Sequence, residues 1–258
     1  MKKNVEEVIK YWDQKIKKSA NPWEGVMWHG LPVWNSYIDK LQMHYLKDIF
    51  RNIKKTDKVL DLGCGVGRFS FRIAENCEQL YGVDSSEEAI KFCKKKALEE
   101  NTQNIKFSVQ DIRNLKFSDN KFDLLLSVTT LQALNNEIQL AKGIKEIFRV
   151  VKRGGLLILL ESTSEKRNDP YNSSLSRKRW IELIEKYGGE IEKTNEIDVP
   201  FLRVIIFKIF YLLNKMGKGG FIDYIEKILT AGLYYLELSL PKIYKNQSIY
   251  SLFIIRKA

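Results

Sequence analysis

Residues 58–67, KVLDLGCGVG, hold a short apolar run that breaks into glycines at alternate positions. Val59, Leu60 and Leu62 predict a buried strand, and the glycines that follow predict a tight turn. Residues 69–77 then carry helical spacing. A strand, a glycine turn and a helix in this order indicate the first unit of an open α/β sheet, in which backbone N–H groups at the helix start face a ligand.

The spacing of the glycines separates two kinds of cofactor. The dinucleotide fingerprint G-x-G-x-x-G/A needs a small third residue, but Arg68 stands there and the glycine falls at Gly67. What remains is D-x-G-x-G-x-G, with Asp61 two residues before Gly63. In this pattern the chain resembles the class I S-adenosylmethionine-dependent methyltransferases. The resemblance implies that Asp61 helps to hold the amino group of the cofactor. It also places the turn beneath the cofactor's amino-acid end, with Gly63, Cys64, Gly65 and Gly67.

Residues 79–84, QLYGVD, predict a second strand. Its last residue, Asp84, comes 23 residues after Asp61, where a carboxylate can accept both hydroxyls of a ribose. The resemblance implies this role for Asp84, with Ser85 beside it. Taken alone, Asp84 would more often be a helix N-cap, so the assignment depends on its companions.

Residues 105–111, IKFSVQD, predict a third strand that ends in Asp111. The resemblance implies that Asp111 and the backbone of Ile112 bind the adenine amino group, although a lone acid here could equally be a solvated strand end. Residues 121–129 predict a fourth strand, whose end lies where cofactor meets substrate in the similar proteins. This implies cofactor contacts for two residues, Ser127 and Val128.

Length and composition fit a globular protein with room for an appended lobe. The chain has 258 residues, of which 44% are hydrophobic. Cys64, Cys77 and Cys93 have no metal-ligand spacing, so we expect reduced thiols and no metal site. No apolar segment follows Lys2 and Lys3, which argues against secretion and predicts a cytoplasmic protein.

The net charge of +11 raises the question of a polyanionic partner. Residues 1–56 and 162–258 each carry an excess of five positive charges, whereas residues 57–161 carry an excess of one. The sequence shows no RNA-binding module and no basic stripe interleaved with aromatic residues, so we do not expect nucleic acid as a partner. Contact of a basic face with an anionic lipid surface stays open.

Two amphipathic helices are expected before the first strand, over residues 4–18 and 35–52. The first carries Tyr11 within the sequence Tyr-Trp-Asp. A Tyr-aromatic-Asp sequence is frequent in this part of the similar methyltransferases, where the segment before the first strand often covers the cofactor. The resemblance therefore implies contact between Tyr11 and the cofactor.

A loop rich in aromatic residues, 21–34, separates these helices, because its prolines and glycines forbid a long helix. In similar methyltransferases such a segment folds over the cofactor as a lid, while packing of its tryptophans on the sheet is an equally open alternative. His29 lies in this loop, where a neutral imidazole could take a proton from an acceptor hydroxyl or amine. A packing or hydrogen-bonding role for His29 also stays open.

Residues 152–162 predict a fifth strand, entered through a Gly-Gly turn. We expect Glu161 at its end to point into the substrate pocket, where it could bind an amine or assist a base. The alternative is a structural acid whose hydrogen bonds are satisfied. Many similar enzymes with small substrates read L-Q-H after the fourth strand, but here Ala133 replaces that histidine.

The later segments complete the expected sheet. Residues 190–199 predict a sixth strand, and residues 249–256 predict a last strand antiparallel beside it. Between them, residues 201–216 and 221–240 form two strongly apolar helical stretches. The first is too short and too charged to span a bilayer. The pair could pack on the N-terminal aromatic residues, cover the active site or lie in a membrane interface.

The expected fold class is α/β, with a seven-stranded, mostly parallel sheet. The resemblance implies transfer of a methyl group from S-adenosylmethionine to an oxygen or nitrogen of a small or medium-sized acceptor. A lipid-linked sugar or quinone, or RNA, stays open as acceptor, and so does a non-catalytic cofactor-binding subunit; the oligomeric state is open too. The expected parts are N-terminal helices and lid (1–56), a core (57–200 with 248–258) and a helical insertion (201–247).

Overall fold

The computed structural model describes residues 3–19, 32–134, 136–163, 170–197, 200–215, 220–240 and 249–258. Within them, seven strands form one sheet in the order β3-β2-β1-β4-β5-β7-β6. The strands β1 to β5 run parallel, while β7 is antiparallel to β5 and β6. The predicted fold class is therefore confirmed. The strands are β1 (Lys58–Leu62), β2 (Gln79–Asp84), β3 (Ile105–Val109), β4 (Phe122–Val128), β5 (Val151–Ser162), β6 (Gly189–Ile197) and β7 (Tyr250–Lys257).

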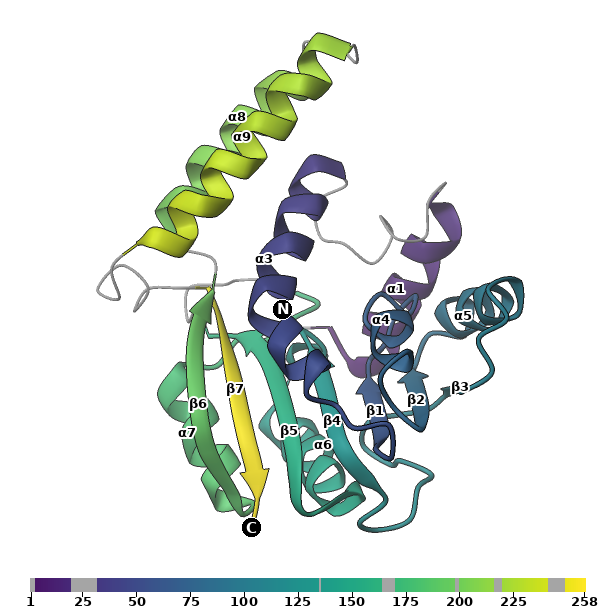
Figure 1. Ribbon diagram of the computed structural model, residues 1–258. Coiled ribbons are helices and arrows are strands. Elements are labelled where there is room, and N and C mark those ends of the chain that lie inside the picture. Colours follow the sequence, from purple (N-terminus) through teal and green to yellow (C-terminus); the bar gives the residue numbers. More distant parts are fainter. Residues whose placement is uncertain are drawn as a thin grey trace.

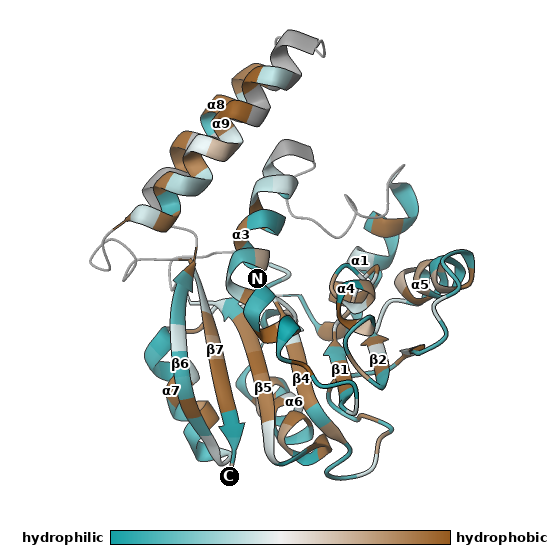
Figure 2. Ribbon diagram, in the orientation of Figure 1, coloured by the Kyte–Doolittle hydropathy of each residue, from teal (hydrophilic) through white to brown (hydrophobic). Residues whose placement is uncertain are grey.

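Helices cover both faces of this sheet (Figure 1). Side chains of α3, α4 and α5 pack on one face, and those of α6 and α7 pack on the other. Successive strand residues alternate between the faces, so Val59 joins the first core and Leu60 the second. The central strands are accordingly mostly hydrophobic (Figure 2). The helices are α1 (Val5–Lys18), α3 (Pro32–Arg51), α4 (Ser70–Ala74), α5 (Glu87–Glu99), the short 3₁₀ helix η1 (Leu131–Ala133), α6 (Glu137–Val150), α7 (Arg177–Lys186), α8 (Pro200–Lys215) and α9 (Gly220–Ser239).

One difference from the expected helices is at the start of α3. This helix begins at Pro32, within the segment expected to be a loop. Proline suits a first helical turn, because the N–H group that it lacks would have no partner there. Trp34 therefore belongs to the helix, and its side chain is buried. One of the three tryptophans expected in the loop is thus part of the core.

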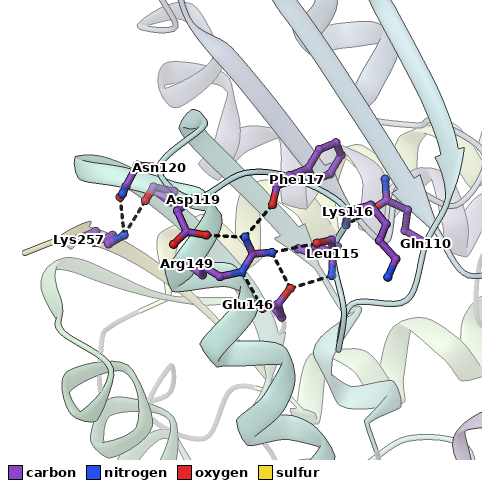
Figure 3. Close-up of polar contacts among 10 residues, drawn as sticks. Gln110, Leu115, Lys116, Phe117, Asp119, Asn120, Glu146, Arg149 and Lys257 are labelled. Carbon is purple, nitrogen blue, oxygen red and sulfur yellow. Dashed lines mark hydrogen bonds and ion pairs between the residues drawn. The ribbon is translucent and has the colours of Figure 1, made fainter.

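Arg149 of α6 holds the loop before β4 (Figure 3). This contact lies at the end of the sheet opposite to the strand ends that carry Asp61 and Asp84. The Nη1 of Arg149 donates to the Phe117 carbonyl at 2.7 Å, and its Nη2 donates to the Leu115 carbonyl at 2.9 Å. Its Nε donates to Glu146 at 2.8 Å, and hydrogen bonding by Arg149 lowers the pKa of Glu146. Since every donor meets an acceptor of the fold, this cluster is structural.

The helices α8 and α9 form a hairpin that extends away from the sheet beside α3 (Figure 1). The hairpin is attached to α3, where the Tyr234 hydroxyl lies 2.9 Å from Nδ1 of His44. No described helix is long and apolar enough to cross a membrane. The outer face of the hairpin is defined here by its exposed apolar and tyrosine side chains: Val204, Ile205, Tyr211, Leu212, Tyr224, Ile228, Tyr235 and Leu236.

Candidate functional site

Two adjoining cavities lie at the carboxyl ends of the parallel strands. The larger, of about 210 Å³, lies between the turn after β1, the residues after β4 and the start of α3. The smaller, of about 60 Å³, lies between α1 and the residues that follow β3. Open α/β sheets bind ligands at this edge, where the strand order reverses. The walls shared by both cavities are Trp12, Gly63, Asp84, Ser85, Thr130 and Ala133.

The turn after β1 depends on glycine. Gly63, Gly65 and Gly67 have φ values of +68°, +53° and +80°, a region that glycine enters without steric cost. The turn is attached to β2, because the N–H groups of Gly63 and Cys64 donate to the Val83 carbonyl at 2.8 and 3.0 Å. Its backbone therefore forms a fixed part of the wall of the larger cavity.

Asp84, the last residue of β2, lines both cavities. Its Oδ2 accepts a hydrogen bond from the Gly65 N–H at 2.9 Å, and its Oδ1 accepts one from the Ser86 N–H at 2.9 Å. Burial raises the pKa of Asp84, and these donors oppose that rise. Each oxygen keeps a further lone pair, so the carboxylate can accept two hydroxyl groups. The N-cap of α5 is Ser86, so the alternative of Asp84 as that cap is wrong.

Asp61, within β1, is a second carboxylate at the larger cavity. Its side chain is buried, and the Ser70 hydroxyl donates to its Oδ2 at 2.5 Å. Burial raises the pKa of Asp61 to about 6, while the bond from Ser70 and the charge of Arg68 oppose the rise. Asp61 is therefore mostly ionised at neutral pH and can hold a cationic group.

The smaller cavity combines a carboxylate with apolar walls. Although burial favours the neutral form of Asp111, hydrogen bonds from Arg113 lower its pKa. The Nε of Arg113 lies 2.9 Å from both carboxylate oxygens. Ile112 lies beside this pair, and Val8 and Ile9 of α1 form the facing wall. This space fits a flat ring with a polar edge.

Comparisons with known proteins agree with this geometry. Residues 53–198 match the family model of a methyltransferase domain. The chain belongs to this methyltransferase family. It is 33% identical over 203 residues to a demethylmenaquinone methyltransferase from Staphylococcus epidermidis, and the match covers 76% of this chain and 79% of that protein. Several solved structures with the same fold are S-adenosylmethionine-dependent methyltransferases, among them one from Aquifex aeolicus that is 19% identical with a TM-score of 0.55, covering 72% of this chain and 92% of its own.

Other similarities are shorter or weaker. The putative methyltransferase YqeM of Bacillus subtilis is 32% identical over 129 residues, which is 48% of this chain and 51% of that protein. The chain thus spans about half the length of the first curated relatives that it matches. The crystal structure of the 4+2 cyclase SpnF matches 100% of this chain and 97% of its own, with a TM-score of 0.68 and 20% identity. At that identity, the likeness shows the fold alone.

The first helix of the chain, α1, faces the cavities with Trp12 and not with Tyr11. Trp12 lines both cavities, whereas Tyr11 lines neither and stacks on Tyr171 with the ring centroids 4.0 Å apart. Asp13 accepts a hydrogen bond from the Ser86 hydroxyl, which fixes α1 on the start of α5. Neighbouring helix residues point about 100° apart, and of these two rings it is Trp12 that faces the site. The structure therefore does not bring Tyr11 to the expected cofactor position.

Glu161, at the end of β5, does not line either cavity. It is 0% exposed, and its Oε1 accepts hydrogen bonds from the N–H groups of Thr130 and Leu131 at 3.1 and 3.0 Å. The Gln132 N–H and the Ser127 hydroxyl donate to it as well, at 3.3 and 3.2 Å. The expectation that Glu161 points into the substrate pocket is wrong, because its carboxylate accepts the unpaired N–H groups at the start of η1. Burial raises its pKa to about 7, and these four donors oppose the rise.

The end of β4 reaches the larger cavity through Val128, whereas the Ser127 side chain is fully buried. The next residue, Thr129, also lines this cavity and has a φ of +53°, which is uncommon for a β-branched residue. Its N–H group donates to the Leu160 carbonyl at 2.7 Å, so the bend is held by β5. Of the two residues implied for this position, only Val128 can touch a ligand in the cavity.

The loop expected to act as a lid falls largely on residues 20–31, outside the described part of the chain. His29 lies in that segment, so its role as a base stays a prediction. In the ranges that the structure does describe, no group of three His, Cys, Asp or Glu side chains could hold a metal ion.

Sequence reasoning missed the wall that α3 gives to the larger cavity. Asn35, Ile38 and Gln42 line it, and Arg68 lies beside them. Arg68 donates to Asp39 at 2.7 Å and to Gln42 at 2.6 Å. We call Asn35, Ile38, Gln42 and Arg68 the α3 wall. Two amides on the buried face of an amphipathic helix were the signal in the sequence that could have revealed it.

Proposed function

We propose that this methyltransferase binds S-adenosylmethionine along the two cavities and transfers its methyl group to an oxygen or nitrogen of a small or medium-sized acceptor at the α3 wall. The main support is the placement of three carboxylates at the ends of adjacent strands around one glycine turn. In this proposal Asp84 and Ser85 bind the ribose, Asp61 binds the amino group, and Asp111 with Ile112 binds the adenine.

The cofactor supplies a methyl group activated by a positively charged sulfur. The protein then has to align the acceptor with that methyl and exclude water. Trp12 borders both cavities, so it covers the point where the cofactor would pass from one to the other. Val128 and Thr129 form the wall where the methyl group would meet the acceptor. For acceptors that must lose a proton, His29 is the proposed base.

Calorimetry with S-adenosylmethionine, S-adenosylhomocysteine and NAD tests the cofactor half of this proposal. We expect micromolar binding of the first two and no binding of NAD. Asp84→Asn should weaken binding by about 100-fold, because it removes the charge from a pair of hydrogen bonds to the ribose. Asp57→Asn is the matched control, since Asp57 precedes β1, lines neither cavity, and its carboxylate accepts a hydrogen bond from the Lys54 N–H at 2.9 Å. Absence of binding for both sulfur compounds, or equal affinity in Asp84→Asn, would contradict the proposal.

Methyl transfer itself separates this function from a non-catalytic cofactor-binding subunit. The fold is shared with the cyclase SpnF, so the fold alone does not fix the reaction. We expect isotope-labelled methyl groups to move from the cofactor to one member of a panel of phenols, amines, sugars and quinols. Tight cofactor binding without transfer to any member would favour the subunit.

A quinone or another lipid-linked acceptor is the second candidate, and the hairpin of α8 and α9 supports it. The name of the Staphylococcus relative gives a quinone as its acceptor. On the outer face, Tyr235 is 68% exposed and Leu212 is 60% exposed. Lys208 and Lys215 of α8 are also exposed and could meet anionic headgroups. We propose that this face lies in the interface of an anionic bilayer, and that the protein is cytoplasmic with peripheral membrane contact.

Flotation with vesicles of phosphatidylglycerol and phosphatidylcholine tests the membrane contact. We expect the wild type to float with these vesicles and to release them at high salt. Leu212→Ser with Tyr235→Ser should reduce the bound fraction at least about tenfold, because two apolar side chains no longer enter the interface. The control is Leu98→Ser, since Leu98 is 82% exposed on α5, away from the hairpin. Equal loss in the control and the double variant would remove the support for a specific face.

A further inference from the structure

Asn35, near the start of α3, is a buried amide without a hydrogen-bond partner. It is 8% exposed, and neither its Nδ2 nor its Oδ1 reaches a donor or an acceptor within the part of the chain that the structure describes. The residue lines the larger cavity. Buried polar groups are almost always hydrogen-bonded, and an unpaired one destabilises the fold. An unpaired amide in a cavity wall therefore points to a ligand.

The other polar residues of the α3 wall, Gln42 and Arg68, have hydrogen-bond partners within the fold, which sets Asn35 apart. Gln42 lies about two helical turns further on and is also buried, but its Oε1 accepts a hydrogen bond from Arg68 at 2.6 Å. Arg68 is held by Asp39 as well, at 2.7 Å. The two amides share one helix and one cavity, and they differ in that only Gln42 has a partner.

The surroundings of Asn35 indicate the chemical class of the ligand. Trp34, Ile38 and Phe69 line the same cavity, and their side chains are largely apolar. An amide offers N–H donors and a carbonyl acceptor, so its complement must both accept and donate, as a hydroxyl group does. The cavity therefore fits an apolar ring that carries a hydroxyl.

We propose that Asn35 selects the acceptor by hydrogen bonding to a hydroxyl group on an otherwise apolar ring in the larger cavity. This inference rests on the proposed methyl transfer and extends it to an acceptor class and to the residue that recognises it. Nδ2 donates to the hydroxyl oxygen, and Oδ1 accepts the hydroxyl proton. An analogue without the hydroxyl is rejected, because it leaves the buried amide unpaired.

Stability provides a first test that needs no ligand. Leucine has nearly the shape of asparagine, so Asn35→Leu removes an unpaired amide and should raise the melting temperature of the free protein by about 2 to 4 °C. Gln42→Leu is the matched control and should lower the melting temperature, since it deprives Arg68 of an acceptor. A melting temperature that falls in Asn35→Leu would show a structural role and overturn the proposal.

Binding of two probes of equal size provides the second test. Phenol carries a hydroxyl where toluene carries a methyl group, and the tryptophan fluorescence of the cavity reports their binding. We expect phenol to bind the wild type at least about tenfold more tightly than toluene, and this preference to vanish in Asn35→Leu. A wild type without the preference, or a variant that keeps it, would overturn the proposal.

Calorimetry with S-adenosylhomocysteine keeps this inference separate from the proposed function. Asn35→Leu should bind S-adenosylhomocysteine within twofold of the wild type, taken as about the error of such a comparison. A wild type that fails to bind it would overturn the proposed function, whereas both tests of Asn35 use the free protein and would still stand. A variant that loses S-adenosylhomocysteine would place Asn35 at the cofactor and overturn its assignment to the acceptor.

Discussion

Gly63→Ala is expected to lower the free energy of unfolding by about 2 to 5 kcal/mol. The backbone of Gly63 has a φ of +68°, which costs a residue with a Cβ about 1 to 2 kcal/mol. The new Cβ would also lie 2.0 Å from Cγ2 of Thr130, a contact that forces the neighbour to move. Thr130 is held by hydrogen bonds from its hydroxyl to the carbonyls of Leu62 and Val128, at 3.2 and 3.1 Å. Urea unfolding measures the loss.

Gly154→Ala is the matched control for this prediction. Gly154 has nearly the same φ, +71°, but no atom lies within 4 Å of the position that a Cβ would take. Gly154→Ala should therefore lower the free energy of unfolding only by the cost of the backbone conformation, about 1 to 2 kcal/mol. If both variants lost the same free energy of unfolding, the close approach of Thr130 to the glycine turn would make no contribution to the loss. The shape of the larger cavity would then not depend on that contact.

The sheet and the positions of the three acids at its edge could be predicted because their signals are local. Each of β1, β2 and β3 is a short strand pattern with an acid in or just beyond it, which gives Asp61, Asp84 and Asp111. Parallel strands place their carboxyl ends at one edge, so position along the strand was enough to bring the three acids to adjoining cavities. No knowledge of the packing was needed for this step.

The remaining walls of the cavities could not be predicted, because they depend on how elements pack. The spacing of α1 predicts one buried face, but it does not say whether Tyr11 or Trp12 meets the cavity. Residues Leu160, Glu161 and Ser162 are all buried, so the alternation that marks the two faces of a strand is lost where helices cover both. Asn35 lies on a helix whose partner surface is set by the whole fold.

Glu161→Ala is expected to lower the free energy of unfolding by about 3 to 5 kcal/mol. The substitution leaves the N–H groups of Thr130, Leu131 and Gln132 without the acceptor that now serves them. These residues form a wall of the larger cavity, in which Thr130 and Gln132 take part directly, so cofactor binding should fall together with stability. A variant of unchanged stability that had lost only methyl transfer would instead show a catalytic Glu161.

The pH dependence of stability decides whether burial or hydrogen bonding governs the charge of Glu161. Burial raises its folded pKa to about 7, above the value of about 4.3 in an unfolded chain, so the native state keeps the proton longer. We take the free energy of unfolding of the wild type minus that of Glu161→Gln. This difference should fall from about pH 4 to pH 7, by at most about 1.4 kcal/mol per pH unit, and level off above pH 7. The glutamine keeps the size of the side chain and does not titrate, so the difference isolates this one carboxyl group from the others. A difference that rises over the same range would mean that the four donors outweigh burial and hold Glu161 as a permanent carboxylate beneath the cavity wall.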